Sequence, residues 1–275
     1  MQNKNIFPVF NDVSFKFDEI QFSHVESYWS EIATYYQYNR LYLVTDGGGK
    51  ITIDKEEIQL LPGHIYCIPP HSIIKSECND YLDHFYIHFR ILPQNNNLNN
   101  YLSFTHEIDA TAFDKNLFQM MCDNFPPKDA SQDYIIESSC QLLLVKLLSS
   151  AKLLSNTALR FNNTLKYINE HLYQKITLEE LSDIASLEKK YFCTLFKNTF
   201  GITPLDYVNS QKLKHSMTYL LDDSYIIKEV AYKVLFNDEF YYSRLFKKKF
   251  GISPSEFRRQ YIKYPQKKSP LILHD

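Results

Sequence analysis

Cysteine pairs are missing from this chain of 275 residues, because its five cysteines are odd in number and none forms a Cys-x-x-Cys pair. This pattern argues against a disulfide framework and against a zinc site, and it favours reduced thiols in the cytoplasm. Long apolar segments are missing too. No run of 18 apolar residues occurs, and the first residues contain no extended apolar stretch. Secretion and a membrane span are therefore not expected.

The chain as a whole also lacks an excess of either charge, since its net charge is −2. The two parts of the chain differ, however. Residues 1–160 contain 12 Lys and Arg against 19 Asp and Glu, whereas residues 161–275 contain 18 against 13. A basic C-terminal part attached to an acidic partner indicates that the C-terminal part contacts a polyanion.

The first 92 residues consist of short β-rich segments separated by turn signals. Residues 40–45 and 50–53 are predicted strands, and residues 46–49 (Asp-Gly-Gly-Gly) are a predicted turn between them. The last and longest strand is predicted over residues 82–90. Regularly spaced short strands of this kind are typical of a small sandwich or barrel.

The last of these strands has two different faces. His84, Tyr86 and His88 alternate with Phe85, Ile87 and Phe89, so the two sets point to opposite sides of the sheet. If the His/Tyr face points inward, it can hydrogen-bond a polar ligand inside the barrel. If the Phe face points inward, the histidines lie outside.

Residues 93–100 are a predicted polar loop, after which the apolar period changes to that of helices. Helices are expected over residues 114–125, 129–155 and 162–173. The second contains an apolar run at residues 142–148 that must be covered, either by an intrachain core or by a dimer interface. The Pro- and Lys-rich tail, residues 265–275, is expected to be poorly ordered.

A unit at residues 191–204 returns at residues 241–254. In both copies apolar residues at helical spacing are followed by Gly, at Gly201 and Gly251, and then by Pro. This predicts a helix that ends at a left-handed glycine. Thr177 and Glu180 have the spacing of a capping box that opens a preceding helix. Each copy is therefore predicted to be a helix-turn-helix unit.

These residues resemble the AraC/XylS family of bacterial transcription regulators, whose DNA-binding domain has two helix-turn-helix units joined by a linker helix. The matching positions are Leu181, Tyr191, Phe192, Phe196, Lys197, Gly201, Pro204 and Tyr207 in the first unit, and Ile227, Glu229, Ala231, Val234, Phe236, Asp238, Tyr241, Tyr242, Ser243, Arg244, Phe246, Lys247, Phe250, Gly251, Ser253, Pro254 and Arg258 in the second. Residues 42–49, 61–63, 68–71 and 86–89 also resemble, less specifically, the cupin-like sensor barrel of that family.

The resemblance implies an α+β multidomain fold, with a cupin-like ligand-sensing β-barrel at residues 1–92 and a helical connector, suited to dimerisation, at residues 93–160. An all-α DNA-binding domain with two helix-turn-helix units follows at residues 161–264, and its linker helix is expected over residues 205–221. Four positions depart from the family pattern. Glu188 replaces the usual Ser cap, and Leu235 stands where the second turn usually has Gly. In the linker helix, Lys212 replaces the usual Arg and Ser216 the usual Ala. A left-handed Leu235 would be strained.

By position, the resemblance also implies which side chains reach DNA. The candidates for base contacts are Lys190, Cys193, Thr194, Glu239, Phe240, Ser243 and Arg244, and those for phosphate contacts are Lys197, Lys247, Lys248 and Lys249. Arg244 could bond guanine in a bidentate manner and Phe240 could touch a thymine methyl group. The alternative for each charged residue is a solvated helix face.

The implied function is that of a cytoplasmic transcription activator, without enzymatic activity or cofactor, that binds double-stranded DNA and responds to a small molecule, with a sugar favoured by family analogy. RNA polymerase and a second copy of the chain are the implied protein partners. Candidates for contacting the small molecule are Trp29, Arg40, Tyr42, His71, Tyr86 and His88. A fatty acid, which needs an apolar cavity and one cation such as Arg40, stays open beside a sugar, which Trp29 would suit. The alternatives are a regulator controlled by a protein partner without a ligand, and a metal-dependent cupin enzyme. The enzyme is disfavoured because His71 lacks the second histidine that metal cupins place one residue away.

Overall fold

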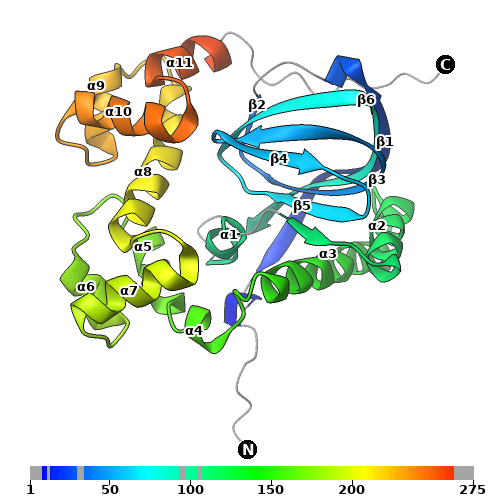
Figure 1. Cartoon of the computed structure of the whole chain (residues 1–275), viewed down its shortest axis with the longest axis horizontal. Helices are drawn as coiled ribbons and strands as arrows, with labels where there is room; N and C mark the ends of the chain where they lie inside the picture. The colour runs from blue at the N-terminus through cyan, green and yellow to red at the C-terminus, as the bar shows by residue number, and fades with distance from the viewer. Residues whose placement is uncertain (1–7, 11–12, 30–33, 93–96, 105–106, 263–275) are drawn as a thin grey trace, which may run out of the picture.

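The computed structural model describes residues 8–10, 13–29, 34–92, 97–104 and 107–262 (Figure 1). An N-terminal β-sheet domain is followed by helices, and the second half of the chain is entirely helical. No helix in these ranges is long and apolar enough to cross a membrane. The tail at residues 265–275 lies outside the described residues.

The N-terminal domain is a single antiparallel sheet in which the long strand β6 pairs with both β1 and β3. The hydrogen-bonded order is β1-β6-β3-β5-β7, with β2 added to β6 and β4 added to β3. Among the described ladders none joins β1 to β7, so closure into a barrel stays a prediction. The strands are β1 (Ser14–Glu26), β2 (Thr34–Tyr36), β3 (Asn39–Ile53), β4 (Glu56–Leu60), β5 (His64–Ile68), β6 (Ser72–Leu92) and β7 (Glu107–Asp109).

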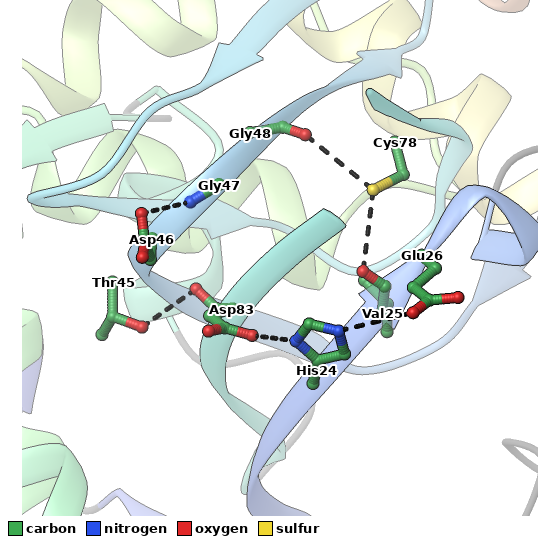
Figure 2. Close-up of polar contacts among 9 residues, drawn as sticks. All are labelled: His24, Val25, Glu26, Thr45, Asp46, Gly47, Gly48, Cys78 and Asp83. Atoms are coloured by element: carbon green, nitrogen blue, oxygen red, sulfur yellow. Dashed lines mark hydrogen bonds and ion pairs between the residues drawn. The ribbon is translucent and has the colours of Figure 1, made fainter. Parts of the chain in front are cut away.

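The turn predicted at residues 46–49 is wrong, because β3 continues through this segment with two shifts in its register against β6. The glycines are needed for close approach: a Cβ at Gly47 would collide with the Tyr81 carbonyl group, and one at Gly49 with that of Glu77. Figure 2 shows the bulged segment beside Cys78, whose Sγ lies 3.9 Å from the Gly48 carbonyl oxygen. The chain reverses instead after Ile53, where Asp54 and Lys55 have positive φ angles.

Helices cover one face of the sheet. Leu41, Leu43, Ile87 and Phe89 on this outer face belong to one apolar core with α2 (Ala112–Asn124) and α3 (Ala130–Ser150). Caps at Thr111 and Asp129 begin these two helices. Most of the apolar run at residues 142–148 is buried in this core, although Leu142 is exposed. An intrachain core therefore accounts for the run.

The polar segment after the sheet is not entirely a loop, because residues 97–102 form α1 (Asn97–Leu102). A helix is possible here because Leu98, Tyr101 and Leu102 share its buried side. The rings of Tyr101 and Phe104 contact aromatic rings in the helical half of the chain. Phe104 stacks on Phe200 at 4.6 Å and on Tyr207 at 5.3 Å between ring centroids. This contact joins the sheet domain to the first repeated unit.

The helical half contains α4 (Asn156–Leu159), α5 (Asn162–Glu170), α6 (Leu178–Ile184), α7 (Lys189–Phe200), α8 (Pro204–Leu220), α9 (Ile227–Lys233), α10 (Glu239–Phe250) and α11 (Pro254–Ile262). Helix α8 runs from the unit formed by α6 and α7 to the unit formed by α9 and α10 (Figure 1). The first unit shares the large core of the sheet's outer face. The second has its own core, to which the sheet domain contributes Tyr35.

Candidate functional site

The repeated units fold into two equivalent helix-turn-helix motifs. The predicted capping box is confirmed, because the Thr177 side chain accepts from the backbone of Glu180 and the Glu180 carboxylate from that of Thr177. The two turns share a left-handed residue, Ser186 with φ 53° and Leu235 with φ 60°. Each recognition helix ends at a left-handed glycine, as predicted. The strained geometry expected for Leu235 is therefore present.

The first recognition helix, α7, begins at Glu188, whose carboxylate accepts a hydrogen bond from the Tyr191 N–H at 3.0 Å. This carboxylate thus caps the helix in place of the usual serine, and the bonds from the Lys190 and Tyr191 N–H groups lower its pKa. Lys190, Thr194 and Lys197 are exposed along one side of the helix, whereas Cys193 is half-buried. The spacing of four and then three residues places the exposed three on one stripe.

The second recognition helix, α10, repeats this stripe at positions fifty residues later. Phe240, Arg244 and Lys247 are exposed, and Phe240 has 73% of its surface accessible. Ser243 and Glu239 are half-buried. The stripe thus combines an apolar ring with two cations.

Two lysines beside the recognition helices already have partners. Lys249 lies 3.9 Å from the Asp54 carboxylate in the turn between β3 and β4, whereas Lys248 is exposed. Lys189 pairs with Glu179 at 2.6 Å, which ties the two helices of the first motif together. The Lys189–Glu179 pair was not expected from the sequence, because its members belong to different helices.

Helix α8 holds the second motif through a buried hydroxyl pair. Ser216 Oγ lies 2.9 Å from the Tyr242 hydroxyl, and neither side chain has accessible surface. The serine that departs from the family pattern therefore has a partner. Its position on α8 fixes the start of α10 relative to the linker helix.

The face of the sheet opposite α2 and α3 contains a polar group of side chains, which we call the inner-face cluster. It consists of Trp29, Arg40, Tyr42, His84, Tyr86 and His88. Strand register explains it, because Arg40 pairs with His88, Tyr42 with Tyr86 and Val44 with His84 across β3 and β6. The His/Tyr face of β6 is thus a buried face, opposite the one that packs against α2 and α3.

Contacts within the inner-face cluster are dense. Arg40 donates to the Tyr42 hydroxyl at 3.3 Å, and its guanidinium lies 3.9 Å from the centre of the Tyr36 ring. The Tyr86 hydroxyl donates to Glu19 at 2.7 Å, and His88 Nδ1 lies 3.2 Å from the same carboxylate. Glu19 was missed by the sequence analysis because it comes from β1, far away in the chain.

Three buried nitrogens of this cluster have no hydrogen-bond partner within the described part of the chain: Arg40 Nε, His84 Nδ1 and His88 Nε2. Burial lowers the pKa of His84 to about 4 and also lowers the pKa of His88. Both imidazoles are therefore neutral near pH 7, and each can donate or accept one further hydrogen bond. Unpaired buried nitrogens of this kind are costly unless a ligand or water joins them.

His71, the sixth candidate for ligand contact, does not join the inner-face cluster. Its Nδ1 lies 2.6 Å from the Tyr35 hydroxyl, and its ring stacks at 6.0 Å on His215 of α8. It therefore lies at the junction between the sheet domain and the linker helix. Sequence alternation could not assign it because residue 71 precedes β6.

Comparisons with known proteins agree with the two motifs. Residues 181–260 match the family model described as "Helix-turn-helix domain". The MmsAB operon regulatory protein of Pseudomonas aeruginosa is 30% identical over 94 residues, which are 34% of this chain and 31% of that protein. The Transposon Tn10 TetD protein of Escherichia coli is 31% identical over 93 residues, or 34% of this chain and 67% of that protein. The matched segment spans about a third of the first curated relatives.

Two further matches extend over most of the chain. The lactose operon transcription activator of Staphylococcus xylosus is 22% identical over 242 residues, 83% of this chain and 86% of that protein. The structure of ToxT from Vibrio cholerae with a bound unsaturated fatty acid has a TM-score of 0.53 and 10% identity, covering 92% of this chain and 98% of that one. At this identity the structural match shows a shared fold, a sheet domain followed by a helical domain.

Proposed function

Because the chain belongs to the AraC/XylS family of transcription regulators, we propose that it binds double-stranded DNA sequence-specifically and activates transcription in response to a small molecule. The observation that carries the proposal is the pair of equivalent stripes on α7 and α10. Two recognition helices on one domain can enter successive major grooves about 34 Å apart along one face of DNA.

Base recognition is assigned to the exposed first half of each stripe. Arg244 has the donor fork that pairs with guanine, and Phe240 can contact a thymine methyl group. Lys190 and Thr194 take the corresponding positions on α7, although the Thr194 hydroxyl already donates to the Lys190 carbonyl at 3.0 Å. Cys193, Ser243 and Glu239 are half-buried and assist from the side of the stripe.

Phosphate contacts are assigned to Lys197, Lys247 and Lys248, which are exposed and come later in the helices. Such contacts supply affinity without sequence information and make binding salt-dependent. Lys249 can join them only after it leaves Asp54.

The small molecule is assigned to the inner-face cluster of the N-terminal domain, which we take to be a cupin-like sensor at residues 1–92. Neutral imidazoles, two tyrosines and Trp29 provide hydrogen bonds and an aromatic surface, the chemistry that a carbohydrate requires. The bound fatty acid of the ToxT structure supports a small-molecule effector in this architecture. A homodimer built through residues 93–160, and contact with RNA polymerase, complete the proposal.

The proposal is tested by exposing the purified protein to a genomic DNA library at two salt concentrations and sequencing what is retained. We expect two short conserved blocks about one helical turn apart, with retention that weakens steeply as salt rises. Arg244→Gln should cost about 1–3 kcal/mol on the selected site and relax one position of it, whereas Lys248→Gln should weaken binding to all sequences alike.

Retention without any sequence preference would overturn sequence-specific binding. The effector is then sought by adding single sugars to the protein on its selected site and measuring the change in affinity. His88→Gln, matched with the peripheral variant His24→Gln, tests the inner-face cluster. If the sugars act equally on both variants, the effector does not bind there, and a regulator controlled by a protein partner becomes the better account.

A further inference from the structure

A cavity of about 270 Å³ lies at the junction between the sheet domain and the helical half, apart from the inner-face cluster. We call it the junction cavity. The sheet domain contributes Asn39 and His71 to its wall, α1 contributes Asn99 and Asn100, and α8 contributes Lys214. In Figure 1, α1 lies between the sheet and the lower part of α8. A ligand here would contact the sensor domain and the linker helix at once.

The charges around the junction cavity are of one sign. Within the described part of the chain, its lining contains Arg90, His71, His215 and Lys214 but neither Asp nor Glu. Arg90 is paired with Asp18 at 3.0 Å. Burial lowers the pKa of His71 to about 3 and also lowers the pKa of His215, so both rings are neutral near pH 7. Lys214 is therefore the cation of the lining that lacks a matching anion.

Lys214 is 92% buried, since its exposed fraction is 8%. No hydrogen bond or ion pair of its ammonium group occurs among the residues that the structure describes. Burial and then the charge of Lys249 lower its pKa to about 8, while the charge of Asp54 acts in the opposite direction. The ammonium group of so deeply buried a side chain has few water contacts, and without a partner this is costly. An anion in the cavity would remove that cost.

The rest of the lining is rich in side-chain amides. Asn39 donates to Asn99 at 3.0 Å, while its buried Oδ1 has no partner among the described residues. Tyr207 donates to the oxygen of Asn100 at 2.8 Å, which holds that amide in place. Amides that are fixed in this way bind hydroxyl groups. Among the residues that the structure describes, the apolar side chains of the lining are Pro69, Pro70 and Ile91, too few to cover a long hydrocarbon chain.

We propose that the junction cavity binds a small hydrophilic anion, a carboxylate or phosphate that also has hydroxyl groups, with Lys214 as its counter-ion. The ligand joins α8 to the sensor domain and thereby fixes the linker helix between the two helix-turn-helix motifs. The effect of this ligand on DNA binding rests on the proposed function, whereas the binding of the ligand to the cavity does not.

The experiment measures heats of binding on the full-length protein at pH 7 with three anionic probes: inorganic phosphate, citrate and glucose 6-phosphate. Glucose is the uncharged probe and oleate is the apolar anion. We expect saturable binding of at least one hydrophilic anion, and weaker binding of glucose. Lys214→Gln should lower the affinity for the anion about tenfold, the usual effect of losing one charge-assisted hydrogen bond. Lys214→Arg should restore most of it.

Lys212→Gln is the matched control, because Lys212 is also on α8 and also 8% exposed but does not line the cavity. It should leave the anion's affinity unchanged. Circular dichroism of each variant shows whether it is folded. Equal affinity in Lys214→Gln and wild type would overturn the site, and binding of oleate without the three hydrophilic anions would overturn the ligand class.

Failure of all three anions to bind would overturn the proposal as a whole. Preference for phosphate and glucose 6-phosphate, or for citrate, identifies the anionic group. DNA selection on the same preparation, without any anion, tests the proposed function separately. A protein that binds citrate but retains no DNA would keep the cavity assignment and lose the regulator, and the reverse result would do the opposite.

Discussion

Replacing Leu235 by glycine should relieve strain in the turn of the second helix-turn-helix motif. Leu235 has φ 60°, a conformation that costs an ordinary residue about 1–2 kcal/mol and costs glycine nothing. Glycine also gives the unfolded chain more conformational freedom, which offsets about 0.4–1 kcal/mol of the strain that is relieved. The difference leaves a net stabilisation of about 0.8 kcal/mol.

The side chain itself complicates the comparison with wild type. Leu235 is 40% exposed, so its removal also loses some buried apolar surface. Leu235→Ala is therefore the proper reference, because it removes the same contacts and keeps the strain. We expect Leu235→Gly to be more stable than Leu235→Ala by about 0.8 kcal/mol, measured as a shift of the urea midpoint at unchanged slope.

Two further pairs of variants calibrate the result. Ser186 has φ 53° in the first motif and should show the same order, glycine above alanine. Lys248 lies exposed inside α10, where alanine should exceed glycine by about 1 kcal/mol. If Leu235→Gly proves less stable than Leu235→Ala while Lys248 behaves as expected, the turn is not left-handed in solution and the reasoning fails.

Three other predictions concern buried groups. Ser216→Ala should destabilise the protein by about 1–3 kcal/mol because it strands the Tyr242 hydroxyl, and adding Tyr242→Phe should recover most of this in urea unfolding. His71 contributes stability that is full above about pH 6.5, where the unfolded state is also neutral, and is lost toward its native pKa of about 3. His71→Asn should therefore reduce the fall in urea midpoint between pH 7 and pH 5, with the remainder due to other buried histidines such as His215; an unchanged fall would contradict the role of His71. Citrate affinity should decrease above about pH 8 as Lys214 loses its proton, whereas an affinity independent of pH up to 9.5 would contradict a role for that ammonium group.

The helix-turn-helix motifs could be predicted from sequence because their signals are local. The capping box at Thr177 and the glycines at 201 and 251 act within one helical turn of the residues they bond. The left-handed turn at Leu235 was implied by the family resemblance, since the family usually has Gly at this position. These features depend little on the rest of the chain.

The sheet domain was harder because its decisive contacts join distant residues. The glycines at 47 and 49 are typical of a turn, yet the carbonyl groups of Tyr81 and Glu77 on β6 explain them. Alternation in β6 separated His84 from Phe85 correctly. It could not tell which of these faces the helices cover, since that depends on contacts such as Phe85 with Phe118 of α2.

The junction cavity could not be anticipated at all. Lys214 is one of many lysines in the basic half of the chain, and a charged side chain on a helix is normally solvated. Its burial follows from the docking of α8 against the sheet domain, which brings His71 within 6.0 Å of His215. The apposition of domains, not a local pattern, creates this site.

The stacking of Phe104 on Phe200 and Tyr207 affects where the chain can be truncated to obtain a fragment with the two motifs. A fragment cut at residue 161, where sequence patterns divide the chain, would leave those two rings without their cover. Bare aromatic faces of this size promote self-association in water. A fragment that begins at residue 97 keeps Phe104 but removes the sheet from the buried faces of α2 and α3, so neither cut leaves the apolar core covered. Measurements of DNA binding on the shorter piece would partly report an adhesive surface that the intact protein never presents.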